Sequence, residues 1–138
     1  MRVVLDPNVL ISALISPQGP AAEILAAWVV ERFEIVVSEK LLAELDDVLA
    51  RPKFRRWVAE SDSLQFVAVL AQSATVVGDP PAPAGLSPDP DDDYLIALAE
   101  TAGADCLVSG DRHLTELVDP SPPILTPREF LDTLPHAG

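Results

Sequence analysis

Residues 2–15 read Arg-Val-Val-Leu-Asp-Pro-Asn-Val-Leu-Ile-Ser-Ala-Leu-Ile, and this opening stretch decides the class of fold. Its first part, residues 2–5, is a short apolar run of the kind found in buried strands of parallel sheets. Residues 8–15 are almost entirely apolar and predict a helix that ends near Pro17. A buried strand that leads directly into a helix is typical of α/β proteins.

The same alternation of short β-branched runs and longer helical stretches continues along the chain. It predicts a parallel sheet with helices on both faces. The predicted strands are residues 2–5, 34–37, 74–77, 105–109 and, at an edge, 122–125. The predicted helices are residues 8–15, 21–30, 38–49, a short one within 51–57, one that follows Ser61 or Ser63, 91–102 with Gly103 after its end, one that begins within 110–113, and 127–134.

Length and composition indicate one globular domain over residues 1–138. Hydrophobic residues make up 49% and charged residues 22%, which excludes wholesale disorder. The proline-rich segment 79–90 is expected to be a surface connection, because neither flank is long enough to fold alone. Cys106 is the only cysteine, so an internal disulfide is excluded, and we expect it to be buried in a protein of the reducing cytoplasm. No apolar run approaches the ~18 residues of a membrane span.

The net charge of −13 limits the classes of function. Proteins that coat nucleic acid non-specifically need many Lys and Arg contacts to phosphates, which this composition argues against. An enzyme in which metal ions bridge its own acids and a substrate phosphate is not excluded. Four of the nine Lys and Arg residues lie close together, and they predict either an RNA-backbone contact or a solvated helix face. They are Arg51, Lys53, Arg55 and Arg56.

Several acids fall where a parallel sheet forms its sites, outside the carboxyl ends of the strands. Asp6 follows the first predicted strand and Asp111 the fourth, while the acidic run 91–93 opens a helix expected at the same edge. Glu44 lies within the helix predicted over 38–49. Each acid also has an ordinary structural interpretation. The two strand-end acids can cap helices, the run suits a helix dipole, and the helical glutamate can be solvated.

Taken together, the acids point to a metal site. Like charges a few ångströms apart raise each other's pKa and cost stability unless a cation neutralises them. Oxygen ligands without nearby His or Cys favour Mg²⁺ or Mn²⁺, and two such ions can activate water for phosphodiester cleavage. On a helical wheel Asp92 shares the packed face with Leu95 and Ile96, whereas Asp93 lies further round but within reach of the same edge.

Four stretches of the chain, in this order, resemble the four motifs of PIN-domain nucleases, and they span almost its whole length. They are Leu5–Ser12 (LDPNVLIS), Ser38–Leu45 (SEKLLAEL), Asp89–Ala99 (DPDDDYLIALA) and Gly103–Leu114 (GADCLVSGDRHL). Within that family the similarity is to VapC-like ribonucleases, the toxin components of toxin–antitoxin systems. The resemblance implies a three-layer α/β/α sandwich around a central parallel sheet of four to five strands, and metal-dependent hydrolysis of RNA.

The resemblance also implies roles for individual acids. Asp6, Glu44 and Asp111 match acids of a site for Mg²⁺ or Mn²⁺. The acid of the third motif is Asp92 if the Asp-Pro-x-Asp pattern is aligned, and Asp93 if the spacing to the fourth motif is aligned. We retain both, with Asp92 preferred because the helical wheel also turns it inward.

Supporting residues and partners follow from the same likeness. Asn8 and Ser12 match polar positions that hold the first acid or a metal-bound water, and Ser109 matches a hydroxyl position beside the fourth acid. His113 is common at its place in the family, but we expect it to pack or to cap a helix. The likeness further implies a product with 5′-phosphate and 3′-hydroxyl ends, a homodimer, and a cognate antitoxin that blocks the site by inserting an Arg among the acids.

Two other functions fit parts of the sequence. A phospho-acceptor or phosphatase domain would also use acids and Mg²⁺, but the only lysines, Lys40 and Lys53, come early, and Asp6 is followed by Pro-Asn where such a phosphatase has x-Asp. A catalytically silent PIN-like fold that binds a basic protein fits the charge of −13. Binding of a divalent ion would distinguish the nuclease from this protein-binding module.

Overall fold

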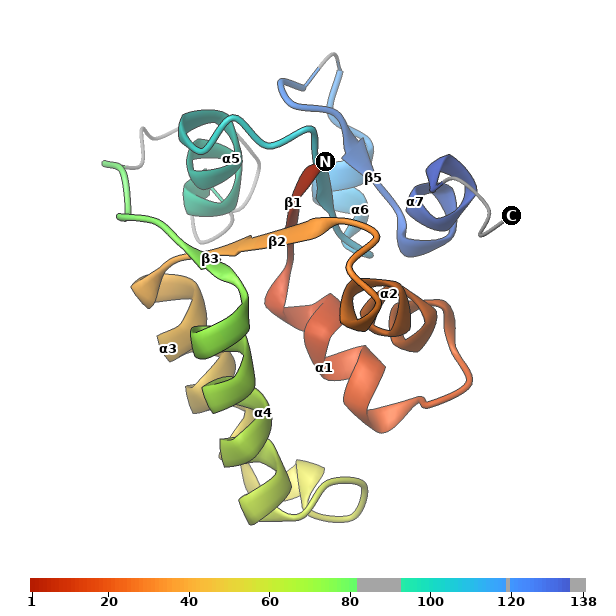
Figure 1. The fold of residues 1–138 in the computed structure, drawn as a ribbon, viewed down its shortest axis with the longest axis vertical. Coiled ribbons are helices and arrows are strands. Elements are labelled where there is room, and N and C mark those ends of the chain that lie inside the picture. The colour runs from red at the N-terminus through yellow and green to blue at the C-terminus, as the bar shows by residue number, and fades with distance from the viewer. Residues whose placement is uncertain (82–92, 119, 135–138) are drawn as a thin grey trace.

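The computed structural model describes residues 1–81, 93–118 and 120–134, and it confirms the predicted α/β class (Figure 1). The sheet has five strands in the order β3-β2-β1-β4-β5, and every neighbouring pair runs parallel. The strands are β1 (Arg2–Leu5), β2 (Glu34–Val37), β3 (Thr75–Val76), β4 (Cys106–Val108) and β5 (Ile124–Leu125). The segment predicted as an edge strand is therefore β5, at one end of the sheet.

Helices connect the strands as the periodicity predicted. They are α1 (Pro7–Ile15), α2 (Pro20–Val29), α3 (Glu39–Leu49), α4 (Glu60–Ser73), α5 (Asp93–Thr101), α6 (Arg112–Thr115) and α7 (Pro127–Thr133). Residues 82–92 lie outside the described residues, so they leave untested most of the proline-rich connection and the predicted start of α5.

Two elements differ from the prediction. The helix expected to follow Ser61 or Ser63 begins earlier, at Glu60, with Ala59 as an N-cap that makes no side-chain hydrogen bond. Glu60 and Asp62 lie in its first turn, where their charge suits the positive end of the helix dipole. The short helix expected within 51–57 is a single 3₁₀ turn, Pro52–Phe54.

The strand order contains a switch point between β1 and β4. The connections from β1 to β2 and from β2 to β3 step one way across the sheet, and the connection from β4 to β5 steps the other way. Right-handed crossovers therefore put α1 to α4 on one face and α5 and α6 on the other, and Figure 1 shows α5 across the sheet from α1. At such a point the flanking connections diverge and leave a crevice outside the carboxyl ends of the two strands.

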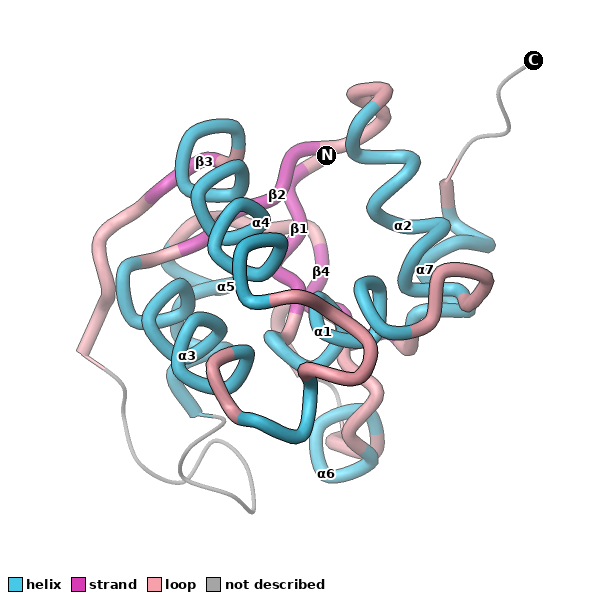
Figure 2. The backbone as a smooth tube through the Cα atoms, turned by 90° about the horizontal axis from the view of Figure 1, so that it is seen from below, coloured by secondary structure: helices cyan, strands magenta, loops and turns pink. Residues whose placement is uncertain are grey.

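Buried aliphatic side chains fill the space between the sheet and its helices. Val3, Val4 and Leu107 of the central strands have no exposed surface. Phe130 of α7 packs edge-to-face on Phe33, which directly precedes β2, with ring centroids 5.1 Å apart. This contact holds α7 beside α2 (Figure 2). Aromatic pairs of this geometry contribute about 0.5–1.5 kcal/mol beyond the area that they bury.

The helices α1 and α2 are mostly apolar and each buries one face, with Leu10 and Ile24 fully buried. Among the described residues no single helix has the length and hydropathy of a membrane span. Together α1 and α2 meet that criterion by length and composition, but the two are bent by 97°. Gly103, predicted to lie just past the end of α5, has φ of +65°, the left-handed conformation that glycine adopts without strain.

Cys106 in β4 gives a test of this packing. The side chain is buried, as predicted, and burial together with the neighbouring Asp105 charge raises the pKa of its thiol to about 11 from 9.0. We expect iodoacetamide at pH 8 to alkylate Cys106 about 100-fold more slowly in the folded protein than in urea, because the reactive thiolate is scarcer. Equal rates in the two states, measured by mass spectrometry, would contradict this packing.

Candidate active site

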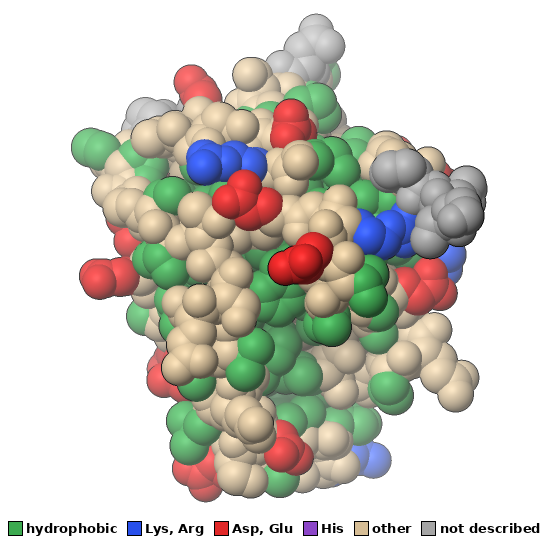
Figure 3. Space-filling model, in the orientation of Figure 1, with side chains coloured by type: hydrophobic (Ala, Val, Ile, Leu, Met, Phe, Trp, Pro, Cys, Tyr) green, Lys and Arg blue, Asp and Glu red, His purple; other side chains and the backbone are tan. Residues whose placement is uncertain are grey.

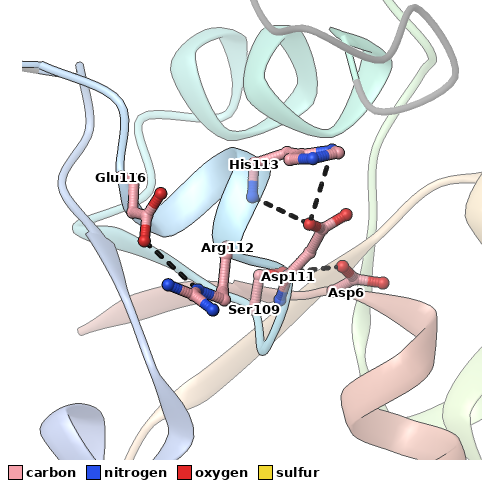
Figure 4. Close-up of polar contacts among 6 residues, drawn as sticks. All are labelled: Asp6, Ser109, Asp111, Arg112, His113 and Glu116. Carbon is pink, nitrogen blue, oxygen red and sulfur yellow. Dashed lines mark hydrogen bonds and ion pairs between the residues drawn. The ribbon is translucent and has the colours of Figure 1, made fainter.

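A serine hydroxyl joins two acids at the carboxyl ends of β1 and β4 (Figure 4). Asp6 directly follows β1, and Ser109 directly follows β4. The Ser109 hydroxyl donates a hydrogen bond to Oδ2 of Asp6 at 2.8 Å, and Ser109 Oγ accepts one from the backbone N–H of Asp111 at 3.0 Å. Because β1 and β4 are adjacent in the sheet, acids that are about a hundred residues apart in sequence meet at one edge.

The local sequence holds Asp6 in a single orientation. Its Oδ1 accepts a hydrogen bond from the backbone N–H of Asn8 at 3.0 Å, so Asp6 is the N-cap of α1. Pro7 occupies the first helical position, where the missing N–H costs nothing. The backbone N–H of Asp6 donates to the Val108 carbonyl at 2.9 Å. The interpretation of Asp6 as an N-cap is therefore correct. Its side chain is also buried, with 4% of the residue exposed.

Asp111 is positioned in the same way at the next helix. Its Oδ1 accepts the backbone N–H of His113 at 2.8 Å, which makes Asp111 the N-cap of α6. The side chain of Asp111 is 34% exposed and that of His113 is 67% exposed, with His113 Nδ1 4.0 Å from the same carboxylate oxygen. His113 thus lies at the rim of the site and contacts the acid that caps its own helix.

The two acids repel each other, and the pair has no cationic partner in the described part of the chain beyond the distant His113 ring. Burial, the largest effect, and the nearby Asp111 charge raise the pKa of Asp6, whereas the hydrogen bonds from Asn8 and Ser109 lower it. The net result is a raised pKa. On the face shown in Figure 3 the acidic side chains are scattered rather than gathered into one patch. A buried carboxylate beside a second one is the arrangement that a bound cation would relieve.

Among the other predicted acids, Asp93 opens α5 and is 2% exposed. Helix α5 packs against β1 and β4, the two strands that end at the acid pair. Asp92, the preferred third-motif acid, lies outside the described residues, so the choice between Asp92 and Asp93 stays a prediction. Within residues 1–81, 93–118 and 120–134, no three acidic, His or Cys side chains come close enough together to hold a metal ion.

Glu44 is tied to α5 through a residue that the sequence did not single out. The Tyr94 hydroxyl donates a hydrogen bond to Glu44 Oε2 on α3. Tyr94 is 5% exposed and follows the buried Asp93 in the sequence. The Lys40 ammonium lies 4.5 Å from the centroid of the Tyr94 ring. A hydroxyl-bearing aromatic beside an acid, on a helix that is otherwise aliphatic, was the signal available in the sequence.

The polar residues Asn8 and Ser12 lie on α1 and line a pocket of about 630 Å³ whose wall includes Asp111. Both are exposed at this opening. The backbone of Asn8 also bonds to Asp6, so this pocket adjoins the acid pair on the α1 side.

The structure does not bring the four clustered cations to the acid pair. They lie around the turn between α3 and α4, at the end of these helices that points away from the sheet (Figure 1). Arg55 donates to the Leu49 carbonyl at the end of α3, and its Nε and Nη1 are buried without a hydrogen-bond partner among the described residues. Arg51 pairs with Asp47 at 3.8 Å, and the Arg56 guanidinium lies 4.8 Å from the Trp57 ring centroid.

Comparison with known proteins places the chain among relatives of this fold. A family profile described as PIN domain matches residues 2–113. An uncharacterised protein of Methanocaldococcus jannaschii is 28% identical over 141 residues, which cover 96% of this chain and 90% of that protein. The crystal structure of VapBC2 from Rickettsia felis, bound to a DNA fragment from its promoter, matches 91% of this chain and 97% of its own with a TM-score of 0.61 and 14% identity.

A second solved structure, FitAcB from Neisseria gonorrhoeae, matches 91% of this chain and 98% of its own, with a TM-score of 0.58 and 18% identity. At these identities the two structures establish the fold, which agrees with the predicted parallel-sheet sandwich.

The raised pKa of Asp6 predicts a pH-dependent penalty on stability. Because the folded state holds this proton more tightly than the unfolded chain, the free energy of unfolding falls as pH rises above 3.8 and through the raised value. Asp6→Asn removes the charge, keeps an N-cap oxygen, and can donate from Nδ2 to Ser109. We expect it to be more stable than wild type at pH 7 without divalent ions, with the gain vanishing below pH ~4. Urea unfolding at both pH values measures this, and an Asp46→Asn control should show no such gain.

The Tyr94–Glu44 hydrogen bond predicts coupling between α5 and α3. In a double-mutant cycle of Tyr94→Phe and Glu44→Gln, we expect a coupling free energy of about 1 kcal/mol, because the phenol donates to a charged acceptor. Urea unfolding of the four proteins measures it. In the control cycle, Glu44→Gln is replaced by Asp46→Asn on the same helix. That cycle should be additive within about 0.5 kcal/mol, and similar coupling in both cycles would contradict the assignment.

Proposed function

This chain belongs to the PIN-domain family, and from that premise we propose that it is a metal-dependent endoribonuclease that hydrolyses RNA phosphodiester bonds. We also propose that it is the toxin of a toxin–antitoxin pair, that its domain extends over residues 1–138, and that it acts in the cytoplasm. The observation that carries the proposal is the Asp6–Ser109–Asp111 unit at the switch point of the sheet.

The donor set at this unit fits Mg²⁺ or Mn²⁺. All its candidate ligands are oxygen atoms, which hard cations prefer, and His113 is turned to the rim. Mg²⁺ is commonly held by one or two carboxylates, with water and substrate phosphate completing the octahedron, so a pair of described acids is sufficient. The buried, uncompensated carboxylate of Asp6 supports the same conclusion, since a cation would neutralise it.

When bound, the ion supplies a polarised water and charge stabilisation at the phosphate. Asp6 and Asp111 would hold it. The hydrogen bonds from Asn8 and Ser109 fix Asp6 before the ion arrives, so little ordering of this side chain opposes binding. Asp92 or Asp93 from the start of α5 would be the third acid.

Glu44 is proposed as the fourth acid, oriented by the Tyr94 hydroxyl. As an exposed residue on α3 it would otherwise sample many rotamers, and the hydrogen bond limits them. In this role the oriented Glu44 carboxylate would accept a proton from the attacking water.

The proposed substrate and partners are inferred from the family and from the net charge of the chain. A protein of charge −13 repels RNA over its general surface, so productive contact needs the cation at the acid pair. Arg51, Lys53 and Arg56 at the α3–α4 turn are proposed backbone contacts, and Arg55 is the weakest of the four because its guanidinium already bonds the Leu49 carbonyl. We propose a homodimer and an antitoxin that inserts an Arg between the acids.

Asp6→Asn and Asp111→Asn test the nuclease. Wild-type protein with Mn²⁺ should cleave single-stranded RNA and leave 5′-phosphate and 3′-hydroxyl ends, and each variant should lose about 100-fold or more in rate, because each loses a charged ligand. Asp46→Asn, purified identically, is the control for a general effect of an Asp-to-Asn change and should cleave as wild type does, whereas residual cleavage by the acid variants measures any contaminating ribonuclease. End-labelled RNA on a sequencing gel gives both the rate and the chemistry of the ends.

Equal cleavage by wild type and both acid variants would contradict the assignment. If the chain is instead a catalytically silent protein-binding module, calorimetry would detect no Mn²⁺ binding, and Mn²⁺ would not raise the melting temperature of the wild-type protein.

A further inference from the structure

The pocket of about 630 Å³ beside Asp111 is formed by four separate segments of the chain. It is lined by α1, by the turn that enters α2, by Gly110 and Asp111 of the loop after β4, and by Pro127 at the start of α7. Its volume lies within the ~300–1,000 Å³ typical of small-molecule sites. Asp111 belongs both to this pocket and to the acid pair, so the two sites are continuous.

The α1 wall presents a row of polar side chains. Asn8 and Ser12 are four residues apart and share one face of α1, and Ser16, the C-cap that follows the helix, extends this polar stripe along the pocket. Among the described residues, the side chains of these three residues make no hydrogen bond with the protein. Only their backbone groups do. Serine hydroxyls can donate and accept, and an asparagine amide offers two donors and an acceptor. The stripe can therefore read a polar edge of a ligand.

The remaining surface of the pocket is small and apolar. Gly19, Pro20, Ala21 and the buried Val9 line it together with the polar residues. Among the residues that the structure describes, no aromatic ring and no Lys or Arg lines the pocket. Asp111 is the charged residue in this described lining, and it would repel a phosphate that is not bound to a cation. The pocket therefore suits a flat, uncharged, hydrogen-bonding group.

We propose that this pocket binds the nucleoside next to the scissile phosphate and sets the base preference of cleavage. The inference rests on the proposed ribonuclease function. A phosphate held at the acid pair leaves its neighbouring ribose and base beside Asp111, where the pocket opens. Sequence-specific RNA recognition commonly uses a splayed base that hydrogen-bonds through its edges, and the ribose 2′-hydroxyl adds a further donor and acceptor. Ser12, Ser16 and the Asn8 amide supply the matching groups.

Ser16→Leu tests the pocket without touching the acid pair. Ser16 is exposed, so leucine there should fold while filling the pocket and removing the hydroxyl. Ala26→Leu, an exposed substitution on α2 away from the pocket, is the matched control. On a randomised single-stranded RNA pool with Mn²⁺, we expect wild type and the control to share a base preference at one position beside the cut. We expect Ser16→Leu to lose that preference, with KM raised at least ~10-fold, the cost of a poorly filled recognition pocket, and Mn²⁺ affinity by calorimetry unchanged.

Binding of free nucleosides gives a readout that does not depend on cleavage. Adenosine, guanosine, cytidine and uridine are titrated into ¹⁵N-labelled protein without metal. At least one should shift the amide resonances of Gly19 and Gly110 in wild type and in Ala26→Leu, but not in Ser16→Leu. If nucleosides bind in this way while neither wild type nor any variant cleaves RNA, the proposed nuclease fails, the pocket's role in cleavage fails with it, and only nucleoside binding by the pocket stands. If RNA is cleaved but Ser16→Leu matches Ala26→Leu in cleavage pattern and nucleoside binding, the pocket assignment is overturned.

Discussion

The hydrogen bond between the Ser109 hydroxyl and Asp6 is the contact on which the rest of the site depends. It spans β1 and β4, so it exists only because these two strands are neighbours in the sheet. The same oxygen accepts the Asp111 backbone N–H and thereby sets the path of the loop into α6. Two helix N-caps and two strand ends thus share one buried hydroxyl, and Asp111 also lines the large pocket. Such a shared hydroxyl makes the position of each acid dependent on the other.

The parts of this arrangement that are local in sequence were predictable. Residues 2–8 encode a buried strand and an N-cap, and both occur as the pattern indicated, while the helix begins one residue earlier than predicted, at Pro7. The convergence of Asp6 and Asp111 follows from the general rule for parallel sheets, once both are placed after strands. Their juxtaposition is a feature of the structure, whereas their roles in binding a metal and in catalysis stay predictions.

The parts that depend on packing between distant elements were not predictable. Nothing in periodicity pairs Tyr94 with Glu44, because the pairing depends on how α5 on one face approaches α3 at the sheet edge. For the four clustered cations, proximity in sequence suggested that the side chains share one surface. Arg55 instead satisfies the carbonyl of Leu49 at the end of α3, while its neighbours Arg51 and Arg56 make contacts in other directions. The helix that begins at Glu60 shows that charge in a first turn can define a helix start without a capping side chain.

An acidic protein that acts on a polyanion repels it over most of its surface, except at cationic side chains and where a metal ion is bound. At physiological ionic strength this repulsion is screened beyond about 8 Å, so under the proposed function it would matter most at contact, where phosphate would approach Asp6 and Asp111. Among the described residues no Lys or Arg lines the large pocket, and its polar side chains Asn8, Ser12 and Ser16 are neutral. Recognition of RNA would then be divided between two adjacent surfaces: a carboxylate pair that accepts phosphate through a divalent ion, and a largely neutral pocket that discriminates bases without attracting the backbone. In this division the metal would govern binding at the acid pair, while the cations at the α3–α4 turn would contact the RNA backbone independently of it.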